Sequence, residues 1–226
     1  MKKKYITLLS ASLLIISPAI AEKQFISSEI LPYLRLDSGW SHFRSVHGIT
    51  YISTNNKLKS NTNNIVGAGA GLGINLGDKI RSDITWSHHL GAKLDWENQG
   101  NLVKRKPVID AYFLNFYYET GFALSVFHPY VGAGVGLAAV KDNLSYSVVN
   151  NNSLSYGNYV INKKNNFAYK FILGSAFDLN DQIKFDLSYN YSDYGKSKGI
   201  YTSSNILIGK TPYRAHVINA GLRFGI

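Results

Sequence analysis

The chain of 226 residues contains no cysteine, and its longest apolar run, near the N-terminus, is too short for a transmembrane helix. Without cysteine there are no disulfides, and no Cys/His pattern has the spacing of metal ligands. A helix that spans a membrane needs about 18 or more consecutive apolar residues. If the protein enters a membrane, it must therefore do so as a closed β-barrel, in which neighbouring strands satisfy the backbone hydrogen bonds.

Proline and acidic residues are also scarce. Beyond Pro18, the prolines are Pro32, Pro107, Pro129 and Pro212. Each of these four precedes a predicted strand, where the missing N–H removes no hydrogen bond from the sheet. The chain has 14 acidic residues against 24 Lys and Arg, which gives a formal charge of +10. A surface with this excess of positive charge attracts acidic partners.

The first 21 residues predict a secretory signal peptide. Three lysines follow Met1, an apolar run extends to Ile16, and Ala19-Ile20-Ala21 supplies the small residues of a cleavage site. We expect cleavage after Ala21, so that residues 22–226 form a single domain without a cofactor.

Residues 66–87 contain the clearest structural pattern. In the first half of this segment apolar residues alternate with glycine, and in the second half they alternate with charged or hydroxylated residues. A period of two is typical of strands, and Gly77-Asp78 between the two halves is typical of a hairpin turn. Residues 179–189 repeat the pattern of residues 76–86, so the chain contains a second hairpin of the same kind.

The same alternation recurs along the chain and predicts eight strands. An even number of strands, with long connections on one side and short turns on the other, is typical of outer-membrane barrels. We therefore predict an all-β fold, an eight-stranded antiparallel up-and-down transmembrane β-barrel with long outer loops and short periplasmic turns. Pairing of residues 47–54 or 157–162 within the membrane would raise the count to ten. The strands are expected near residues 33–40, 66–76, 80–88, 108–119, 130–140, 169–178, 183–191 and 218–226, and the outer loops at 41–64, 95–107, 141–165 and 195–212.

Basic and acidic residues occupy the inward-facing strand positions in equal numbers. A barrel of eight strands is wide enough only for the side chains that fill it. Buried charges need partners, so we expect these residues to pair across the interior and to leave no open pore. The predicted lumen charge network is Arg35, Arg81, Lys170, Lys184 and Arg223 with Asp37, Asp83, Glu119, Asp178 and Asp186.

Two motifs suggest other functions but fit them poorly. The GAGAGLG run at residues 67–73 lacks the third glycine of a dinucleotide-binding loop, and a strand follows it where that loop requires a helix. His88 and His89 precede a loop with Asp95 and Glu97, which leaves a His–carboxylate hydrolase as a remote alternative.

The outer loops are rich in lysine, and acidic residues are nearly absent from the first and fourth of them. Such loops favour lipopolysaccharide phosphates, acidic glycans or acidic host-cell surface proteins as partners; nucleic acid is not expected outside the cell. The predicted partner-binding residues are Lys57, Lys59, Lys104, Arg105, Lys106, Lys163, Lys164, Lys196, Lys198 and Lys210.

Five segments give the chain a resemblance to the small outer-membrane barrels of the opacity-protein-like class, and within it to the small rickettsial surface adhesins. The resemblance implies a location in the outer membrane and, for some members, attachment to host-cell proteins. Such barrels usually end in phenylalanine, whereas this chain ends in Ile226, with Phe224 two residues earlier. The segments are YLRLDSG (33–39), GDKIRSDITW (77–86), YVGAGVGLAAVK (130–141), IKFDLSYNYSDYG (183–195) and NAGLRFGI (219–226).

From the sequence we expect a monomeric, non-enzymatic surface adhesin of the outer membrane. The alternatives are a structural envelope barrel without a specific ligand and, less favoured, a narrow porin. The basic loops and the resemblance favour the adhesin, and the balanced interior charge disfavours the porin.

Overall fold

The computed structural model describes residues 30–44, 59–61, 64–90, 94–98, 101–121, 127–150, 153–198, 200–201, 207–208 and 210–226. The expected signal peptide lies outside these residues. No helix among them is long and apolar enough to cross a membrane. The strands are β1 (Ile30–Arg44), β2 (Lys59–Asn61), β3 (Asn64–Leu76), β4 (Ile80–His89), β5 (Leu94–Asn98), β6 (Asn101–Glu119), β7 (Phe127–Asn150), β8 (Ser153–Asp178), β9 (Ile183–Lys196), β10 (Ile200–Tyr201), β11 (Leu207–Ile208) and β12 (Pro212–Gly225).

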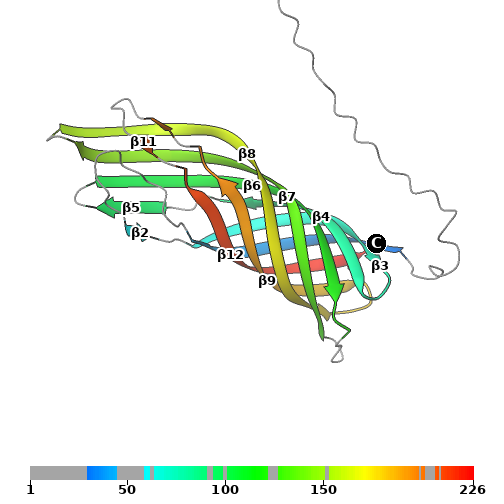
Figure 1. The fold of residues 1–226 in the computed structure, drawn as a ribbon. Helices are drawn as coiled ribbons and strands as arrows, with labels where there is room; N and C mark the ends of the chain where they lie inside the picture. The colour runs from blue at the N-terminus through cyan, green and yellow to red at the C-terminus, as the bar shows by residue number, and fades with distance from the viewer. Residues whose placement is uncertain are drawn as a thin grey trace, which may run out of the picture.

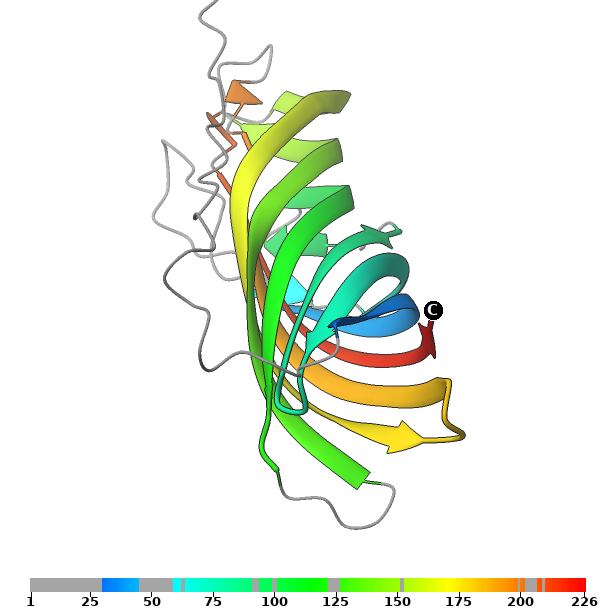
Figure 2. The same cartoon turned by 90° about the vertical axis from the view of Figure 1, so that its right-hand side faces the viewer.

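Eight long strands close into a barrel (Figures 1 and 2). The order around the ring is β6-β4-β3-β1-β12-β9-β8-β7, and pairing of β6 with β7 completes it. Every neighbouring pair in the ring is antiparallel. The short strands β2 and β5 extend the sheet beyond β6, while β10 and β11 form a separate two-stranded sheet. The predicted eight-stranded barrel is therefore confirmed.

Alternation along each strand separates an apolar outer face from a polar interior. Leu72 and Ile84 are 62% and 64% exposed, whereas Arg81 is 1% exposed. A soluble protein shows the opposite distribution, with apolar residues inside. The outer face carries the apolar belt of a membrane barrel, with aromatic residues among the exposed side chains. Belt residues include Leu36, Trp40, Val66, Trp86, Tyr112, Phe116, Leu137, Phe167, Phe171, Leu173, Tyr189 and Ile218.

Inward-facing glycines make room for large side chains from neighbouring strands. A Cβ atom at Gly73 would overlap the ring of Tyr33, and one at Gly134 would overlap the side chain of Asn115. The glycine-rich run in β3 is therefore a packing device for the interior.

Two of the predicted outer loops are strands. β7 continues to Asn150 and β8 begins at Ser153, so the expected loop at 141–165 is a long hairpin. Likewise, β5 and the first part of β6 occupy most of the expected loop at 95–107. β1 also extends to Arg44, into the expected first loop. Together, β2, β5 and the upper parts of β6, β7 and β8 form a wall that projects beyond the barrel (Figure 1).

A β-bulge separates the barrel part of β8 from its projecting part. Val140 pairs with Lys164, but Asp142 pairs with Ile161, so β8 advances by one more residue than β7. Asn162 and Lys163 lie in this bulge and both are exposed. A bulge shifts the inward and outward faces by one residue and increases local twist.

The prolines depart from the prediction, because Pro32, Pro107 and Pro129 lie inside strands. Each occupies a place where one neighbouring strand is missing. Pro107 falls between the end of β4 pairing at Ile109 and the start of β5 pairing at Arg105. Pro32 lies beyond the β12 pairing, and Pro129 lies beyond the β6 pairing. A missing N–H is tolerated at such positions.

Candidate functional site

The interior of the barrel contains a network of charged and phenolic side chains. Arg35 bridges two carboxylates: its Nη2 lies 2.7 Å from Asp37 Oδ1, and its Nη1 lies 2.9 Å from Asp83 Oδ2. The hydroxyls of Tyr33 and Tyr117 donate to Asp83 at 3.0 and 3.2 Å. Asp83 on β4 thus accepts hydrogen bonds from two other strands, β1 and β6, and joins the three strands in the interior.

Arg81 is the centre of a second group. Its Nε lies 3.1 Å from Glu119 Oε1, and its Nη2 lies 3.7 Å from Asp186 Oδ1. The guanidinium carbon lies 3.9 Å from the centroid of the Tyr117 ring and 4.3 Å from that of Tyr130. Cation–π contacts of this kind gain strength when the cation is shielded from water. Arg81 is therefore held by two carboxylates and two aromatic rings.

The remaining members of the predicted network lie in different settings. Arg223 Nε is 3.2 Å from Asp186 Oδ2, and Lys184 Nζ is 2.6 Å from Asp178 Oδ1 at the barrel end. Lys170 differs from the rest: its Nζ lies 4.6 Å from the centroid of the Phe113 ring, and among the described residues no carboxylate is within ion-pair distance of it. The structure thus brings nine of the ten predicted residues into ion pairs.

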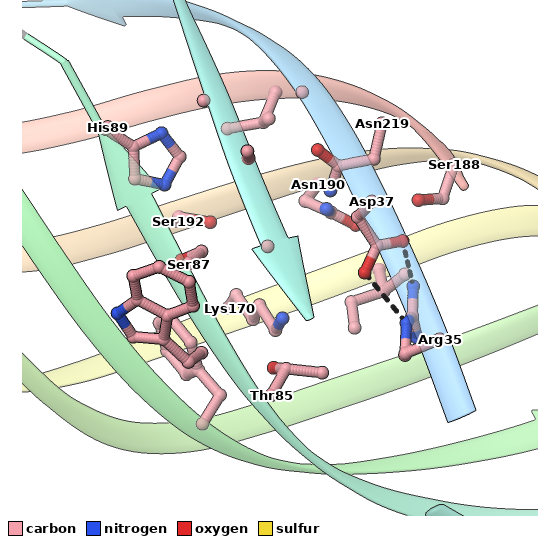
Figure 3. Close-up of a pocket in the computed structure, with 18 of the residues that line it drawn as sticks. Arg35, Asp37, Thr85, Ser87, His89, Lys170, Ser188, Asn190, Ser192 and Asn219 are labelled. Atoms are coloured by element: carbon pink, nitrogen blue, oxygen red, sulfur yellow. Dashed lines mark hydrogen bonds and ion pairs between the residues drawn. The ribbon is translucent and has the colours of Figure 1, made fainter. Parts of the chain in front are cut away.

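A small cavity of about 40 Å³ separates this network from the upper interior. Figure 3 shows the Arg35–Asp37 pair at one end of the cavity, His89 at the other, and Lys170 between them. A volume of this size holds only a few water molecules. Side chains therefore fill most of the space around this cavity.

The predicted charge network left out its phenolic members and one amide. Tyr33, Tyr117, Tyr130 and Asn115 are buried, and Asn115 Nδ2 donates to Asp83 Oδ1 at 2.6 Å. All four share the inward parity of the charged residues on their own strands, so extending the alternation would have found them.

The structure does not form a histidine pair from His88 and His89, because adjacent strand residues point to opposite faces. His88 points outward, and its Nδ1 lies 2.6 Å from Asp110 Oδ1. His89 points inward, where Ser41 Oγ lies 3.4 Å from its Nδ1 and the Tyr194 hydroxyl lies 3.1 Å from its Nε2. In the group formed by Ser41, His89 and Tyr194, the tyrosine hydroxyl takes the place that the carboxylate has in a Ser–His–carboxylate triad.

On the outer side, four lysines from three strands and their flanks gather above the apolar belt; we refer to Lys164, Lys196, Lys198 and Lys210 as the lysine cluster. Lys164 Nζ donates a hydrogen bond to the backbone carbonyl of Lys196 at 2.9 Å. Partial burial, followed by repulsion from the other three lysines, lowers the pKa of Lys164 below its usual value. The four charges therefore lie close enough to repel one another, and a bound polyanion would relieve this repulsion.

Buried hydrogen bonds below the lysine cluster fix the backbone that carries it. Arg105 is fully buried, and its Nη1 lies 2.9 Å from Asp142 Oδ2 and 2.7 Å from Ser197 Oγ. Ser197 N donates to the Thr211 carbonyl at 2.9 Å, and Thr211 N donates back to Ser197 Oγ at 2.8 Å. The Tyr213 hydroxyl completes the group with a 2.7 Å hydrogen bond to Asp142. We call these five residues the clamp.

Arg105 was predicted to project from a loop, and that prediction is wrong. It has the inward parity of Ala111 and Phe113 on β6, so its side chain enters the clamp, while Lys104 and Lys106 on either side are exposed. Burial raises the pKa of Asp142, and burial followed by the Asp142 charge raises the pKa of the Tyr213 phenol. Buried polar groups of this kind are costly unless they are hydrogen-bonded.

The other predicted partner-binding residues fall in two groups. Lys57 lies outside the described residues, and only the backbone of Lys59 is placed, in β2 opposite Glu97. Lys104 and Lys106 project from β6, and Lys163 projects from the bulge of β8. The structure therefore gathers the lysine cluster but leaves these three exposed lysines spread over the outer face of the wall.

Comparison with known proteins places the chain among outer-membrane barrels. A Rickettsia typhi protein named as a putative adhesin is 30% identical over 236 residues, with 99% of this chain and 100% of that protein covered. A Rickettsia conorii protein with the same description is 32% identical over 202 residues, with 85% and 81% covered.

Two solved structures share the fold. OprG, an outer membrane protein from Pseudomonas aeruginosa, has a TM-score of 0.53 at 16% identity, with 88% of this chain and 97% of that chain covered. Outer membrane protein AlkL in lipid bilayers has a TM-score of 0.50 at 12% identity, with 100% and 97% covered. The family model described as outer membrane protein beta-barrel domain matches residues 9–224, and this chain therefore belongs to that family of the outer membrane.

Proposed function

We propose that the protein is a non-catalytic surface adhesin that attaches to acidic ligands on host cells. The observation that carries this proposal is the lysine cluster on its buried clamp. Four cations are presented from a backbone that five buried side chains and their hydrogen bonds hold in place. Pre-organised charge binds with less loss of conformational freedom than charge on a mobile loop. The relation to rickettsial proteins named as adhesins supports the same conclusion.

The test is attachment of bacteria that display the protein to cultured host cells. The first variant changes Lys164, Lys196, Lys198 and Lys210 to glutamine and leaves Arg105 intact, because loss of Arg105 would disturb the fold. The matched control changes the exposed Lys79 in the Gly77–Lys79 turn to glutamine, at the opposite end of the barrel. At equal surface display, the cluster variant should attach weakly and the control normally.

Salt provides an independent measurement. The Debye length falls from about 10 Å at 0.1 M salt to about 3 Å at 1 M, so attachment through exposed lysines should weaken as salt is added. A second variant with Lys104, Lys106 and Lys163 changed to glutamine shows how far the scattered lysines contribute. Equal attachment by wild type and both variants would favour a structural envelope barrel without a specific ligand.

A further inference from the structure

A cavity of about 460 Å³ lies at the end of the barrel that carries the short turns. In outer-membrane barrels this end faces the periplasm. A volume of this size is typical of sites that bind small molecules. A second cavity of about 270 Å³ adjoins it, and we call the two cavities together the vestibule. The residues that line both of them are Leu31, Asn75, Asp181, Lys184 and Arg223.

The two hairpins with the repeated sequence pattern line the vestibule from opposite sides. In this pattern Asp78 corresponds to Asp181, and Arg81 corresponds to Lys184. All four residues line the vestibule. The hairpins β3–β4 and β8–β9 are separated in the ring by β1 and β12 on one side and by β6 and β7 on the other. They therefore face each other across the barrel, and each supplies one acid and one base.

The acids and bases of the two hairpins lie at different depths. Asp78 and Asp181 are exposed in the turns at the rim, whereas Arg81 and Arg223 are buried deeper in the barrel. Glu119 lies beside Arg81 but engages only its Nε, at 3.1 Å. Nη1 and Nη2 of Arg81 have no hydrogen-bond partner among the described residues, so Arg81 retains donors for an incoming acceptor.

The rest of the lining also suits a ligand with two opposite charges and a short aliphatic part. Leu31, Pro129 and Ala176 supply apolar surface, and the side chain of Lys184 is 39% exposed. A ligand with a single charge would meet like charge either at the rim or deeper in the barrel, and like charges oppose binding. A zwitterion matches both levels.

We propose that the vestibule binds a short peptide with free ends from the periplasm. The carboxylate of the peptide lies among Arg81, Lys184 and Arg223, and its amino group lies near Asp78 and Asp181. Charge-assisted hydrogen bonds at both ends set the direction in which the peptide binds. This site is independent of the proposed adhesin function, because the lysine cluster lies at the other end of the barrel.

The experiment places the full, isotope-labelled barrel in lipid bilayers and titrates it with alanyl-alanine. NMR follows the amides of Gly77 and Gly121, because both residues line the vestibule. Alanyl-alanine should shift these two resonances, and the shifts should saturate. The same dipeptide with an acetylated N-terminus and an amidated C-terminus carries no charge, so it should bind at least about tenfold more weakly.

Two tryptophan variants locate the site on the protein. Leu31 is 51% exposed, so Leu31→Trp places an indole in the vestibule without disturbing a buried charge. This variant should keep the native melting temperature and lose the peptide-dependent shifts. The matched control is Leu179→Trp, which adds the same ring at a leucine that is 60% exposed in the turn between β8 and β9 and does not line the vestibule.

A rim variant tests the direction of binding. Changing both Asp78 and Asp181 to asparagine removes the charge that faces the amino group of the peptide. The wild-type protein should prefer free alanyl-alanine to its N-acetylated form, and the double variant should bind the two forms equally. An unchanged preference in the double variant would overturn the proposed orientation.

The remaining outcomes either support the peptide site or overturn it. Saturable shifts that Leu31→Trp abolishes and Leu179→Trp preserves would support it. Shifts that are absent, that do not saturate or that persist in Leu31→Trp would overturn it, and so would equal affinity for the free and the fully blocked dipeptide. Leu31→Trp should attach to host cells like the wild type, so the peptide site and the adhesin function can fail separately.

Discussion

At the scale of single residues, Arg81 has more partners than any other interior cation described. Two carboxylates and two phenol rings surround it, and its side chain is almost fully buried. Removing one member of a buried charge group leaves the others unpaired, which typically costs about 3–5 kcal/mol. We therefore expect Arg81→Ala to lower the free energy of unfolding by about that amount, measured by chemical denaturation in lipid vesicles.

The matched control is Lys184→Ala. The Lys184–Asp178 pair has partners that are 39% and 32% exposed, and exposed pairs contribute only about 0–1 kcal/mol. Arg81→Lys should not restore stability, because an ammonium group lacks the planar shape that stacks on both rings. Equal losses for Arg81→Ala and Lys184→Ala would contradict the network described here.

Arg105 and its neighbours give a second residue-scale prediction. Arg105→Gln leaves Asp142 buried without its cation, so the projecting wall should open more readily, by about 3–5 kcal/mol for a broken buried pair. Hydrogen exchange of the amides of residues 141–147 and 195–197 measures this opening. Lys104→Gln and Lys106→Gln are the controls, since both side chains are exposed. Equal protection in Arg105→Gln and the controls would show that the clamp does not hold the wall.

At the scale of elements, alternation predicted the barrel strands but missed the wall. The apolar residues of β3, β4, β6, β9 and β12 mark the lipid-facing side, and each of these strands was found. Above the belt the outer face carries Lys141, Asn143 and Ser145, so it lacks apolar residues. Only the inner face, with Leu144 and Tyr146 buried, keeps the pattern. An Asn- and Ser-rich sequence was therefore interpreted as a loop.

The sequence predicted which lysines belong to the candidate site, but it did not predict which of them lie together in space. Counting lysines in the outer connections identified the members of the lysine cluster, because their charge is visible in the sequence. Their meeting depends on the bulge in β8 and on the clamp, and both require partners that are far apart in the chain, such as Arg105 and Ser197. To predict that Arg105 is buried, one would have to know that β6 already begins at Asn101.

The lysine cluster should also respond to pH. The pKa of Lys164 lies below its usual value, so charged Lys164 opposes folding at neutral pH, and this opposition declines as pH rises from the lowered pKa to the usual lysine pKa. Anion binding needs the protonated form of Lys164. Because this lysine loses its proton at a lower pH than an ordinary lysine does, binding of a sulfated polysaccharide should also begin to weaken at a lower pH. Lys210→Gln should shift the Lys164 titration, followed by NMR of its Nζ, toward higher pH. An unchanged titration would show that the two side chains do not share a field.

At the scale of the whole molecule, the arrangement of polarity is inverted relative to a soluble protein. The outer belt is apolar, and the interior holds ion pairs, several of them buried, such as Arg35–Asp83. Ion pairs in such an interior stabilise the fold only when every member has a partner. Most partners come from strands distant in the sequence, such as Arg35 on β1 and Asp83 on β4. The network thus closes the ring and fills it at the same time.

The filled interior predicts that the protein does not conduct ions steadily. The cavity of about 40 Å³ lies between the Arg35–Asp37 pair and the ring of His89, and buried side chains, Arg35 and His89 among them, line it. In planar bilayers, the purified protein should therefore give no stable openings of a single size. The double variant Tyr117→Ala and Arg81→Ala removes two large side chains that stack on each other in the interior, so it should raise conductance if it still folds. Lys79→Gln, in the exposed turn, is the control for insertion. Large, uniform openings from the wild-type barrel would favour the narrow porin, because ions can cross only where side chains leave a continuous channel.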